Sequence, residues 1–371
     1  MKVVGLVLTL LLSGTALSAP TVDPKFVDVW SRMDEFNAWR GVRKADAPRE
    51  FRYQKNEDLD GLVGAFMEAN QNTGLIVLKG DALLAERYQY GRTPEHRLAS
   101  ASVAKTVLAM LVGIALHEKK ISSIDDLASR YVSDLKGHPY GETSIRHLLT
   151  MSSGIAVESE NRLIVNTLRQ KTQGGADTVL EWKREAPAGT RFRYNSADSE
   201  VLGLVLFHAT RTPVATYLSE KIWQPMGAEA NATWLVDKGG FETGFCCINA
   251  RLRDYARFGM LLANYGALDG KEIIPAGWVK AATTPERPHL AVGKATPNNG
   301  YGYQTWITSR AEPPHFPRFA ALGIRGQAIF VDPARKIVVV HTAVWADARD
   351  RTGRRAQFKL FEEILTKLES Q

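Results

Sequence analysis

Residues 99–115 read ASASVAKTVLAMLVGIA, and this stretch predicts a buried helix that begins close to Ser102. Its apolar residues recur at helical spacing, at Val103, Val107, Met110, Leu111 and Ile114. Ser102 and Lys105 are three residues apart, so a helix places both side chains on one face. The pattern therefore predicts a serine and a lysine side by side at the start of an apolar helix.

This pair has the chemistry of a nucleophile and its base. A serine hydroxyl is weakly nucleophilic until a neighbour takes its proton, and a lysine can take it only when neutral. The ordinary lysine pKa is about 10.4, so burial or a nearby cation must lower the pKa of Lys105. We expect the apolar helix to supply the burial. The residues alone also allow Ser102 to be a helix N-cap with a solvated lysine one turn on.

The same Ser-x-x-Lys spacing recurs at Ser133–Lys136, so the motif by itself is weak. Gly137-His138-Pro139 follows the second copy, and no apolar helix begins there. This context predicts a surface turn for the second copy.

Two further segments carry candidate site residues. Tyr194-Asn195-Ser196 precedes an apolar helix expected at 197–209, and a tyrosine in such a loop can relay a proton. It could equally be a core aromatic, with Ser196 as a helix N-cap. Residues 321–327, ALGIRGQ, open a strand, and their glycines permit close backbone approach and N–H groups facing a developing oxyanion. A glycine-rich bend between strands is the alternative.

Strand pairs are predicted near both ends of the chain. Residues 74–78 and 83–90 flank a turn at 79–81, and residues 327–331 and 337–344 flank a turn at 332–335. Residues 355–368 carry a helical apolar stripe. We expect an α/β (α+β) fold: an antiparallel sheet flanked by helices, built from about 19–124 and 261–371, with an inserted mainly helical subdomain at about 125–260.

Composition excludes several protein classes. The chain has 371 residues, of which 44% are hydrophobic and 23% charged, as in globular proteins. Two cysteines exclude a disulfide scaffold, the eight histidines form no metal-binding spacing, and we expect no metal or other cofactor. For the adjacent Cys246 and Cys247 we favour two thiols over a vicinal disulfide. Four arginines lie close together without interleaved aromatic residues, so we interpret them as a solvated face and expect no nucleic-acid partner: Arg349, Arg351, Arg354 and Arg355.

Residues 1–18 are typical of an export signal. Lys2 gives a positive start, residues 3–12 form a short apolar run, and Ala16-Leu17-Ser18 offers small residues for cleavage after Ser18. The run is shorter than the roughly 20 residues that a membrane span requires. We therefore expect a mature protein at 19–371, without a membrane span, in the periplasm or secreted.

Taken in order, these segments resemble the penicillin-recognising serine hydrolases, the group of class C β-lactamases, D-alanyl-D-alanine peptidases and related esterases. The resemblance covers roughly residues 70–368 and rests on Ser102-Val103-Ala104-Lys105, Tyr194-Asn195-Ser196 and Ala321-Leu322-Gly323. IRHLLTMSSG (145–154) is similar to the segment that this group usually has between its first two motifs. The branch that contains 6-aminohexanoate-dimer hydrolase is resembled most in GFCC (244–247), RDYARFG (253–259), YGY (301–303) and GIRGQ (323–327).

The resemblance implies a β-lactamase/DD-peptidase-like fold and an acyl-enzyme formed on Ser102. Lys105 and Tyr194 would then carry the proton, and the backbone N–H groups of Ser102 and Ile324 would hold the oxyanion. Ser196, Gly323 and Arg325 would contact a small-molecule amide or ester substrate.

Two departures from the family pattern bear on the substrate. Ser196 stands where asparagine is frequent, and Ala321 stands where a lysine or histidine is common, although Arg325 could supply the missing cation. We therefore expect cleavage of a linear amide or an ester. The alternatives are a class C β-lactamase or D-alanyl-D-alanine peptidase, and a non-catalytic binding protein on the same fold. The oligomeric state is not indicated by the sequence.

Overall fold

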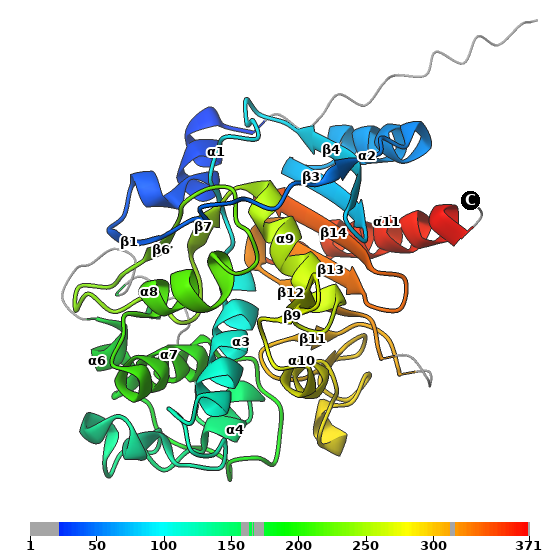
Figure 1. Cartoon of the computed structure of the whole chain (residues 1–371). Helices are drawn as coiled ribbons and strands as arrows, with labels where there is room; N and C mark the ends of the chain where they lie inside the picture. The colour runs from blue at the N-terminus through cyan, green and yellow to red at the C-terminus, as the bar shows by residue number, and fades with distance from the viewer. Residues whose placement is uncertain (1–21, 157–162, 165, 167–173, 312–315, 370–371) are drawn as a thin grey trace, which may run out of the picture.

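The computed structural model describes residues 22–156, 163–164, 166, 174–311 and 316–369 (Figure 1). The predicted signal peptide, residues 1–18, lies outside the described residues. The described chain forms one large sheet, one smaller sheet, a short hairpin and the helices packed around them. No described helix combines the length and apolarity that crossing a bilayer requires.

An eight-stranded sheet joins the two ends of the chain. In spatial order its strands are β10 (Gly300–Tyr301), β11 (Trp306–Ile307), β12 (Phe319–Leu322), β13 (Ala328–Asp332), β14 (Ile337–Ala343), β3 (Asn72–Lys79), β4 (Ala82–Tyr88) and β2 (Arg52–Tyr53). Neighbouring strands are antiparallel, except that β2 runs parallel to β4. Both predicted hairpins, β3–β4 and β13–β14, are confirmed, and so is their union in one sheet through β14 and β3.

Each face of this sheet is covered by helices, because successive strand residues point to opposite faces. Leu75 and Val77 of β3 pack in one apolar cluster with α2 (Glu57–Ala69) and α11 (Arg351–Glu369), the predicted C-terminal helix. Ile76 and Leu78 belong to the cluster on the other face, which includes Phe258 of α9 (Leu252–Ala263). Figure 1 shows α2 and α11 near the strands β3, β4 and β14.

A second sheet of four strands lies beside the first. Its antiparallel order is β1 (Trp39–Val42), β6 (Ala232–Leu235), β7 (Ile248–Ala250) and β5 (Leu98–Ala99). β6 and β7 come from residues 125–260, which we expected to be mainly helical, and they pair with strands from outside that range. The pairing of β5 with β7 holds the segment before Ser102 beside the segment after Cys247.

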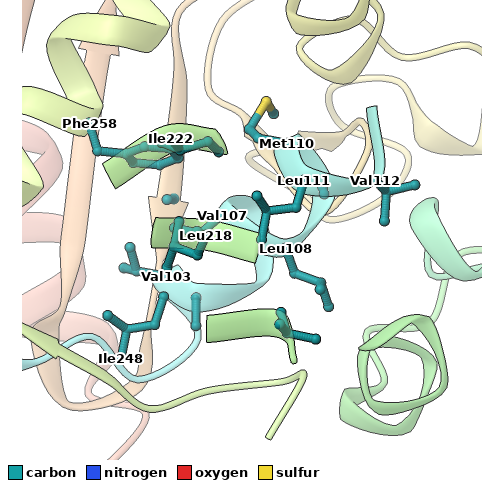
Figure 2. Packing of buried hydrophobic residues seen from close by; sticks show 14 of the residues in the cluster. Val103, Val107, Leu108, Met110, Leu111, Val112, Leu218, Ile222, Ile248 and Phe258 are labelled. Atoms are coloured by element: carbon teal, nitrogen blue, oxygen red, sulfur yellow. The ribbon is translucent and has the colours of Figure 1, made fainter. Parts of the chain in front are cut away.

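The predicted apolar helix is α3 (Val103–His117), and it runs through the centre of the fold. Every residue from 103 to 115 is buried, so this part of the helix has no solvent-exposed face. It packs against α7 (Ser196–Thr210) and α10 (Ala276–Ala282). Figure 2 shows Val107 and Leu218 of α8 (Val214–Leu218) among the side chains of one apolar cluster, and each such buried aliphatic side chain contributes about 1.5–3 kcal/mol.

The remaining helices within the described residues are short. They are α1 (Pro24–Ser31), α4 (Ile145–Leu149) and α6 (Gly175–Val179), the 3₁₀ turns η1 (Met33–Glu35), η2 (Ala128–Arg130), η3 (Ser133–Leu135), η5 (Pro288–Leu290) and η6 (Ile324–Gly326), and the π-helix η4 (Ser219–Trp223). β8 (Ala267–Leu268) and β9 (Lys271–Glu272) form the short hairpin. The second Ser-x-x-Lys copy lies in and just after η3, with Ser133 and Lys136 exposed, as its context predicts.

A glycine allows α10 to approach α3. The Trp278 indole N–H donates to the Ala109 carbonyl at 3.0 Å, and a Cβ at Gly113 would lie 2.2 Å from the Trp278 ring. We expect Gly113→Ala to lower the free energy of unfolding by roughly 1–3 kcal/mol, because the ring or the helix must move. Chemical denaturation measures the change.

Gly61→Ala is the matched control. Gly61 is exposed within α2, and a Cβ there meets no atom within 4 Å. This change should raise the stability by roughly 0.5–1 kcal/mol through helix propensity. A Gly113→Ala protein as stable as Gly61→Ala would contradict the close packing of α3 and α10.

Candidate active site

Ser102 stands at the point where the chain enters α3. The preceding Ala101 has a φ of 43°, in the left-handed region, which costs about 1–3 kcal/mol for a residue with a Cβ. Ser102 is the N-cap of α3, with φ −71° and ψ 0°, and it is partly exposed. Its side chain lines a cleft in the protein surface. The turn therefore holds one hydroxyl between a buried helix and solvent.

Lys105 lies one turn further along α3, with only 1% of its surface exposed. Its Nζ is 2.9 Å from the Ser102 Oγ. The same nitrogen donates to the Phe245 carbonyl oxygen at 2.7 Å and lies 3.4 Å from the Ser196 Oγ. The structure thus brings together the serine and lysine that the sequence pairs. It also places Ser196, which is 5% exposed, beside the amine.

Tyr194 reaches the same nitrogen from the loop before α7. The Lys105 Nζ lies 5.1 Å from the centroid of the Tyr194 ring, and that ring stacks on Trp306 with centroids 5.3 Å apart. Tyr194 and Trp306 both line the cleft with Ser102. Ser102 and Tyr194 therefore both lie beside the Lys105 amine, so the three residues expected from sequence to be catalytic lie together.

Buried hydrogen bonds fix the loop that carries Tyr194. The Asn195 Nδ2 donates to the Tyr140 hydroxyl and to the Asp198 Oδ1, each at 3.0 Å. Ser153 donates to the same Asp198 oxygen at 2.7 Å. Burial raises the pKa of Asp198 to about 7, despite these donors. Asn195, which the sequence placed between two candidate residues, thus anchors the loop.

Gly323 and Ile324 belong to residues 321–327, which we call the third segment, and they bring it against the start of α3. A Cβ at Gly323 would lie 2.8 Å from the Ser100 carbonyl oxygen and 3.0 Å from the Ala101 Cβ, so a larger residue would push the segments apart. Ile324 lines the cleft with Ser102. The N–H groups of Ser102 and Ile324 stand at the starts of α3 and η6, where backbone donors have no acceptor within the helix.

Arg325 has contacts that do not fit the expected role in substrate binding. Its Nη1 donates to the carbonyl oxygens of Trp345 and Ala346, at 2.6 and 2.8 Å. Its guanidinium carbon lies 4.1 Å from the Trp30 ring centroid, and Arg325 does not line the cleft. Two carbonyl oxygens and an aromatic face hold this cation, so its contacts do not support the expectation that it replaces the missing charge at Ala321.

The cleft above Ser102 has a volume of about 940 Å³. All four clustered arginines line it: Arg349, Arg351, Arg354 and Arg355. The interpretation as a purely solvated face therefore missed their position, because only the packing of α11 against the sheet brings them near Ser102. Among the described residues, no three His, Cys, Asp or Glu side chains are grouped to hold a metal ion.

Arg354 supports the third segment from behind. Its Nη2 donates to the Gly323 carbonyl at 2.6 Å, and its Nη1 donates to the Gln357 Oε1 at 2.7 Å. Burial lowers the pKa of Arg354 to about 10, and the nearby Tyr194 acts in the opposite direction. The guanidinium remains charged near neutral pH. Sequence reasoning counted this residue as part of a surface cluster and missed its contact with Gly323.

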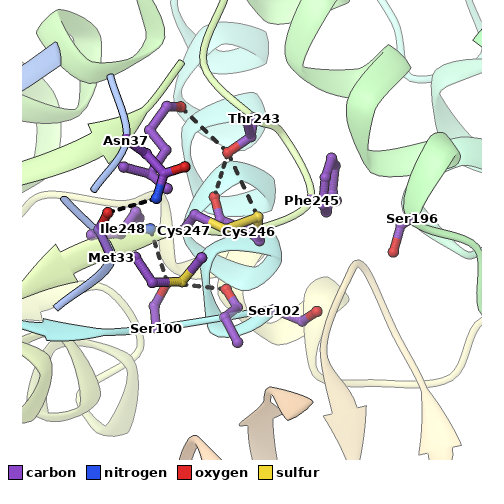
Figure 3. The surroundings of a disulfide bond; sticks show 12 residues. Met33, Asn37, Ser100, Ser102, Ser196, Thr243, Phe245, Cys246, Cys247 and Ile248 are labelled. Carbon is purple, nitrogen blue, oxygen red and sulfur yellow. Dashed lines mark hydrogen bonds between the residues drawn. A yellow bond between two sulfur atoms is a disulfide. The ribbon is translucent and has the colours of Figure 1, made fainter. Parts of the chain in front are cut away.

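Cys246 and Cys247 form a disulfide with each other, which corrects the two thiols that we favoured (Figure 3). Adjacent side chains in a strand point to opposite faces. Here Cys247 has a φ of 79°, and this left-handed turn breaks the alternation. The pair directly follows Phe245, whose carbonyl contacts Lys105.

Glu200 is a second buried carboxyl group that sequence reasoning missed. It is 1% exposed, its Oε2 accepts the Gly244 N–H at 2.9 Å, and its Oε1 has no hydrogen-bond partner among the described residues. Burial raises the pKa of Glu200 to about 8, with a smaller contribution from Asp237. The available clue was an acidic residue directly before the apolar run at 201–207.

Comparisons with known proteins show a family match and a relative that aligns with most of the chain. The family described as Beta-lactamase matches residues 59–359. A 6-aminohexanoate-dimer hydrolase of Paenarthrobacter ureafaciens is 26% identical over 301 residues, which cover 77% of this chain and 76% of the relative.

Solved structures of several proteins share the fold of this chain. A protein of Bacillus anthracis proposed to be a 6-aminohexanoate-dimer hydrolase superposes with a TM-score of 0.84 at 25% identity, covering 96% of this chain and 98% of the other. A D-alanine carboxypeptidase of Burkholderia cenocepacia shares the fold, with a TM-score of 0.60 at 16% identity, over 83% of this chain and 98% of the other.

The raised pKa of Glu200 makes stability depend on pH. The folded protein holds the proton up to about pH 8, whereas an unfolded glutamate releases it near pH 4.3, so the folded state binds more protons between these values. Stability from this group is therefore lost as pH rises through that window, at no more than about 1.4 kcal/mol per pH unit. We expect Glu200→Gln to flatten the decline, measured by urea unfolding from pH 5 to 8.

Glu68→Gln, an exposed change in α2, is the control and should keep the slope of the wild type. Equal slopes for Glu200→Gln and the wild type would show that the buried carboxyl group is not protonated in the folded protein.

Proposed function

Because this chain belongs to the β-lactamase family, we propose that it is a serine hydrolase that cleaves a linear amide or an ester through an acyl-enzyme on Ser102. The observation that carries the proposal is the distance of 2.9 Å between the Lys105 Nζ and the Ser102 Oγ, beside a cleft large enough for a small substrate. A hydroxyl next to a buried amine is the arrangement that activates a serine nucleophile.

The reaction proceeds in two steps. The Ser102 Oγ attacks the substrate carbonyl, and Lys105 takes the hydroxyl proton. The N–H groups of Ser102 and Ile324 stabilise the negative oxygen that forms. The bond to the leaving group then breaks, and Tyr194 passes the proton to the departing amine or alcohol. Water attacks the acyl-enzyme in the second step, which releases the acid and restores the Ser102 hydroxyl.

The composition of the site favours a linear substrate over a β-lactam. Ala321 supplies no charge at the start of the third segment, and the guanidinium of Arg325 is held by backbone carbonyls. Ser196 lies beside Lys105 and does not line the cleft. The similarity to a 6-aminohexanoate-dimer hydrolase supports amide cleavage, and the 6-aminohexanoate dimer is one candidate substrate.

A β-lactamase or a D-alanyl-D-alanine peptidase is the second candidate. One observation favours it: the family that matches residues 59–359 is described as Beta-lactamase. The alternative from another class is a non-catalytic binding protein on the same fold. Wild-type protein that turns over none of the tested substrates would support it.

We further propose that the protein is exported. Residues 1–18 have the charged start, apolar run and small residues of a signal peptide. The mature chain, 19–371, would then act in the periplasm or outside the cell. N-terminal sequencing of protein recovered from these compartments would show whether cleavage follows Ser18.

Three substitutions test the catalytic roles. Ser102→Ala should abolish turnover of a p-nitrophenyl ester, and Lys105→Ala and Tyr194→Phe should lower it by roughly 10² or more. Ser133→Ala and Lys136→Ala are matched controls, because they change the exposed copy of the same motif and should leave turnover unchanged. Wild-type rates in Lys105→Ala and Tyr194→Phe would remove both residues from the mechanism.

A substrate panel tests the proposed specificity. Purified mature protein should hydrolyse p-nitrophenyl esters or the 6-aminohexanoate dimer faster than nitrocefin, because the site has no cation at Ala321. Turnover of nitrocefin at the rate of a dedicated β-lactamase would favour the second candidate instead.

A further inference from the structure

The start of α11 gives one wall of the cleft a strong positive charge. Arg349, Arg351 and Arg355 are exposed and line the cleft, and Arg354 lines it from a half-buried position. Neither Arg351 nor Arg355 forms an ion pair with any described residue. The N-terminus of a helix adds a partial positive charge in the same place.

Asp350 does not neutralise the positive charge of these arginines. Asp350 is the sole acidic residue among the described residues that line the cleft. Its Oδ1 accepts the N–H groups of Thr352 and Gly353, at 2.8 and 3.1 Å, so it caps the first turn of α11. Arg351, Arg354 and Arg355 stand against one engaged carboxylate and make this part of the cleft cationic, and a cleft concentrates such a field.

Apolar side chains line the cleft together with this charge and Ser102. Ile324, Leu322 and Phe358 line the same cleft as the arginines and the serine. A ligand that fits both surfaces has an apolar chain near the reacting carbonyl and a negative group at its end. The planar guanidinium group matches a carboxylate through two parallel hydrogen bonds.

We propose that the cleft recognises a substrate with a carboxylate at the end of an apolar chain, held by Arg351 and Arg355 at the start of α11. This inference rests on the proposed function, because it names the substrate class of the same cleft. It assigns the charge recognition to α11 and not to the third segment, where Ala321 is neutral.

Two matched pairs of esters test the inference. The first compares 4-nitrophenyl hydrogen glutarate with its methyl ester, which places the charge on the acyl side. The second compares 4-acetoxybenzoate with its methyl ester, which places the charge on the leaving group. We expect kcat/KM to be about tenfold or more higher for the acid in at least one pair, and this preference should shrink in 0.5 M salt.

The double variant Arg351→Gln/Arg355→Gln should bring that ratio close to one. Arg43→Gln/Lys44→Gln removes the same charge from exposed residues after β1 and should keep the wild-type ratio. Equal rates for acid and methyl ester in both wild-type pairs would overturn this inference and leave the proposed function standing. No hydrolysis of any of the four esters would overturn the proposed function, and this inference with it.

The disulfide carries a second, independent inference. Phe245 and Cys247 flank Cys246, and each contacts the catalytic segment. The Phe245 carbonyl accepts from the Lys105 Nζ at 2.7 Å, and the Cys247 N–H donates to the Ala101 carbonyl at 3.3 Å. Figure 3 shows the disulfide between Ser102 and Thr243, with Phe245 on the side of Ser196.

A bond between neighbouring cysteines closes a small ring around the peptide unit that joins them. This ring removes backbone freedom from Cys246 and Cys247, which otherwise must be lost on folding. The Thr243 hydroxyl donates to the Cys246 carbonyl at 2.9 Å and holds the turn from the other side. The loop is therefore fixed where it meets both Ala101 and Lys105.

We infer that the Cys246–Cys247 disulfide is a positioning element, which holds the Phe245 carbonyl against the Lys105 amine. This inference also rests on the proposed function. Because the chain has no other cysteines, a reductant changes no other disulfide in it. Reduction should let the Phe245 carbonyl move, so that the amine loses a fixed partner.

Ester turnover before and after reduction by tris(2-carboxyethyl)phosphine in mild urea, followed by removal of the urea, tests this. We expect kcat to fall several-fold with little change in KM, a shifted pH profile of kcat, and recovery after reoxidation. Cys246→Ala/Cys247→Ala should resemble the reduced protein and not respond to the reductant. An unchanged kcat and pH profile in reduced protein, shown to be folded by circular dichroism, would overturn the inference. Absence of turnover in the oxidised protein would instead overturn the proposed function.

Discussion

The structure depends on an amine held inside a protein core. Lys105 belongs to a helix that is buried on all sides, and removing an amine from water costs free energy unless polar partners replace it. The partners are the Ser102 hydroxyl, the Ser196 hydroxyl and the Phe245 carbonyl. Each comes from a different part of the chain, so the need to satisfy one nitrogen joins three segments.

The rest of the fold holds these segments in place. The pairing of β5 with β7 sets the segment before Ser102 beside the loop that follows Phe245. The buried hydrogen bonds of Asn195 fix the loop of Tyr194 at the start of α7. β12 delivers Gly323, whose lack of a side chain lets the third segment reach Ala101. α11 covers the large sheet and brings its arginines to the cleft.

Much of this arrangement follows from local sequence patterns. The apolar periodicity after Ser102 predicts α3, and the three-residue spacing to Lys105 predicts their contact. The alternating strands at both ends predict the two hairpins. The features that the sequence does not predict depend on contacts between residues that lie far apart in the chain. Arg354 meets Gly323 only because α11 folds back on the sheet, and the Phe245 carbonyl has no side-chain chemistry to identify it. Arg325 is the opposite case. The sequence suggests it as the cation that contacts the substrate, but two carbonyl oxygens and Trp30 hold its guanidinium group in the structure.

The central claim is that Ser102 becomes acylated. The most direct measurement is peptide mass spectrometry on protein quenched in acid during turnover of a p-nitrophenyl ester. The account predicts a mass increase equal to the acyl group on the peptide that contains Ser102. An acyl group found reproducibly on another residue, or none in protein that turns the ester over with a burst of p-nitrophenol, would contradict it.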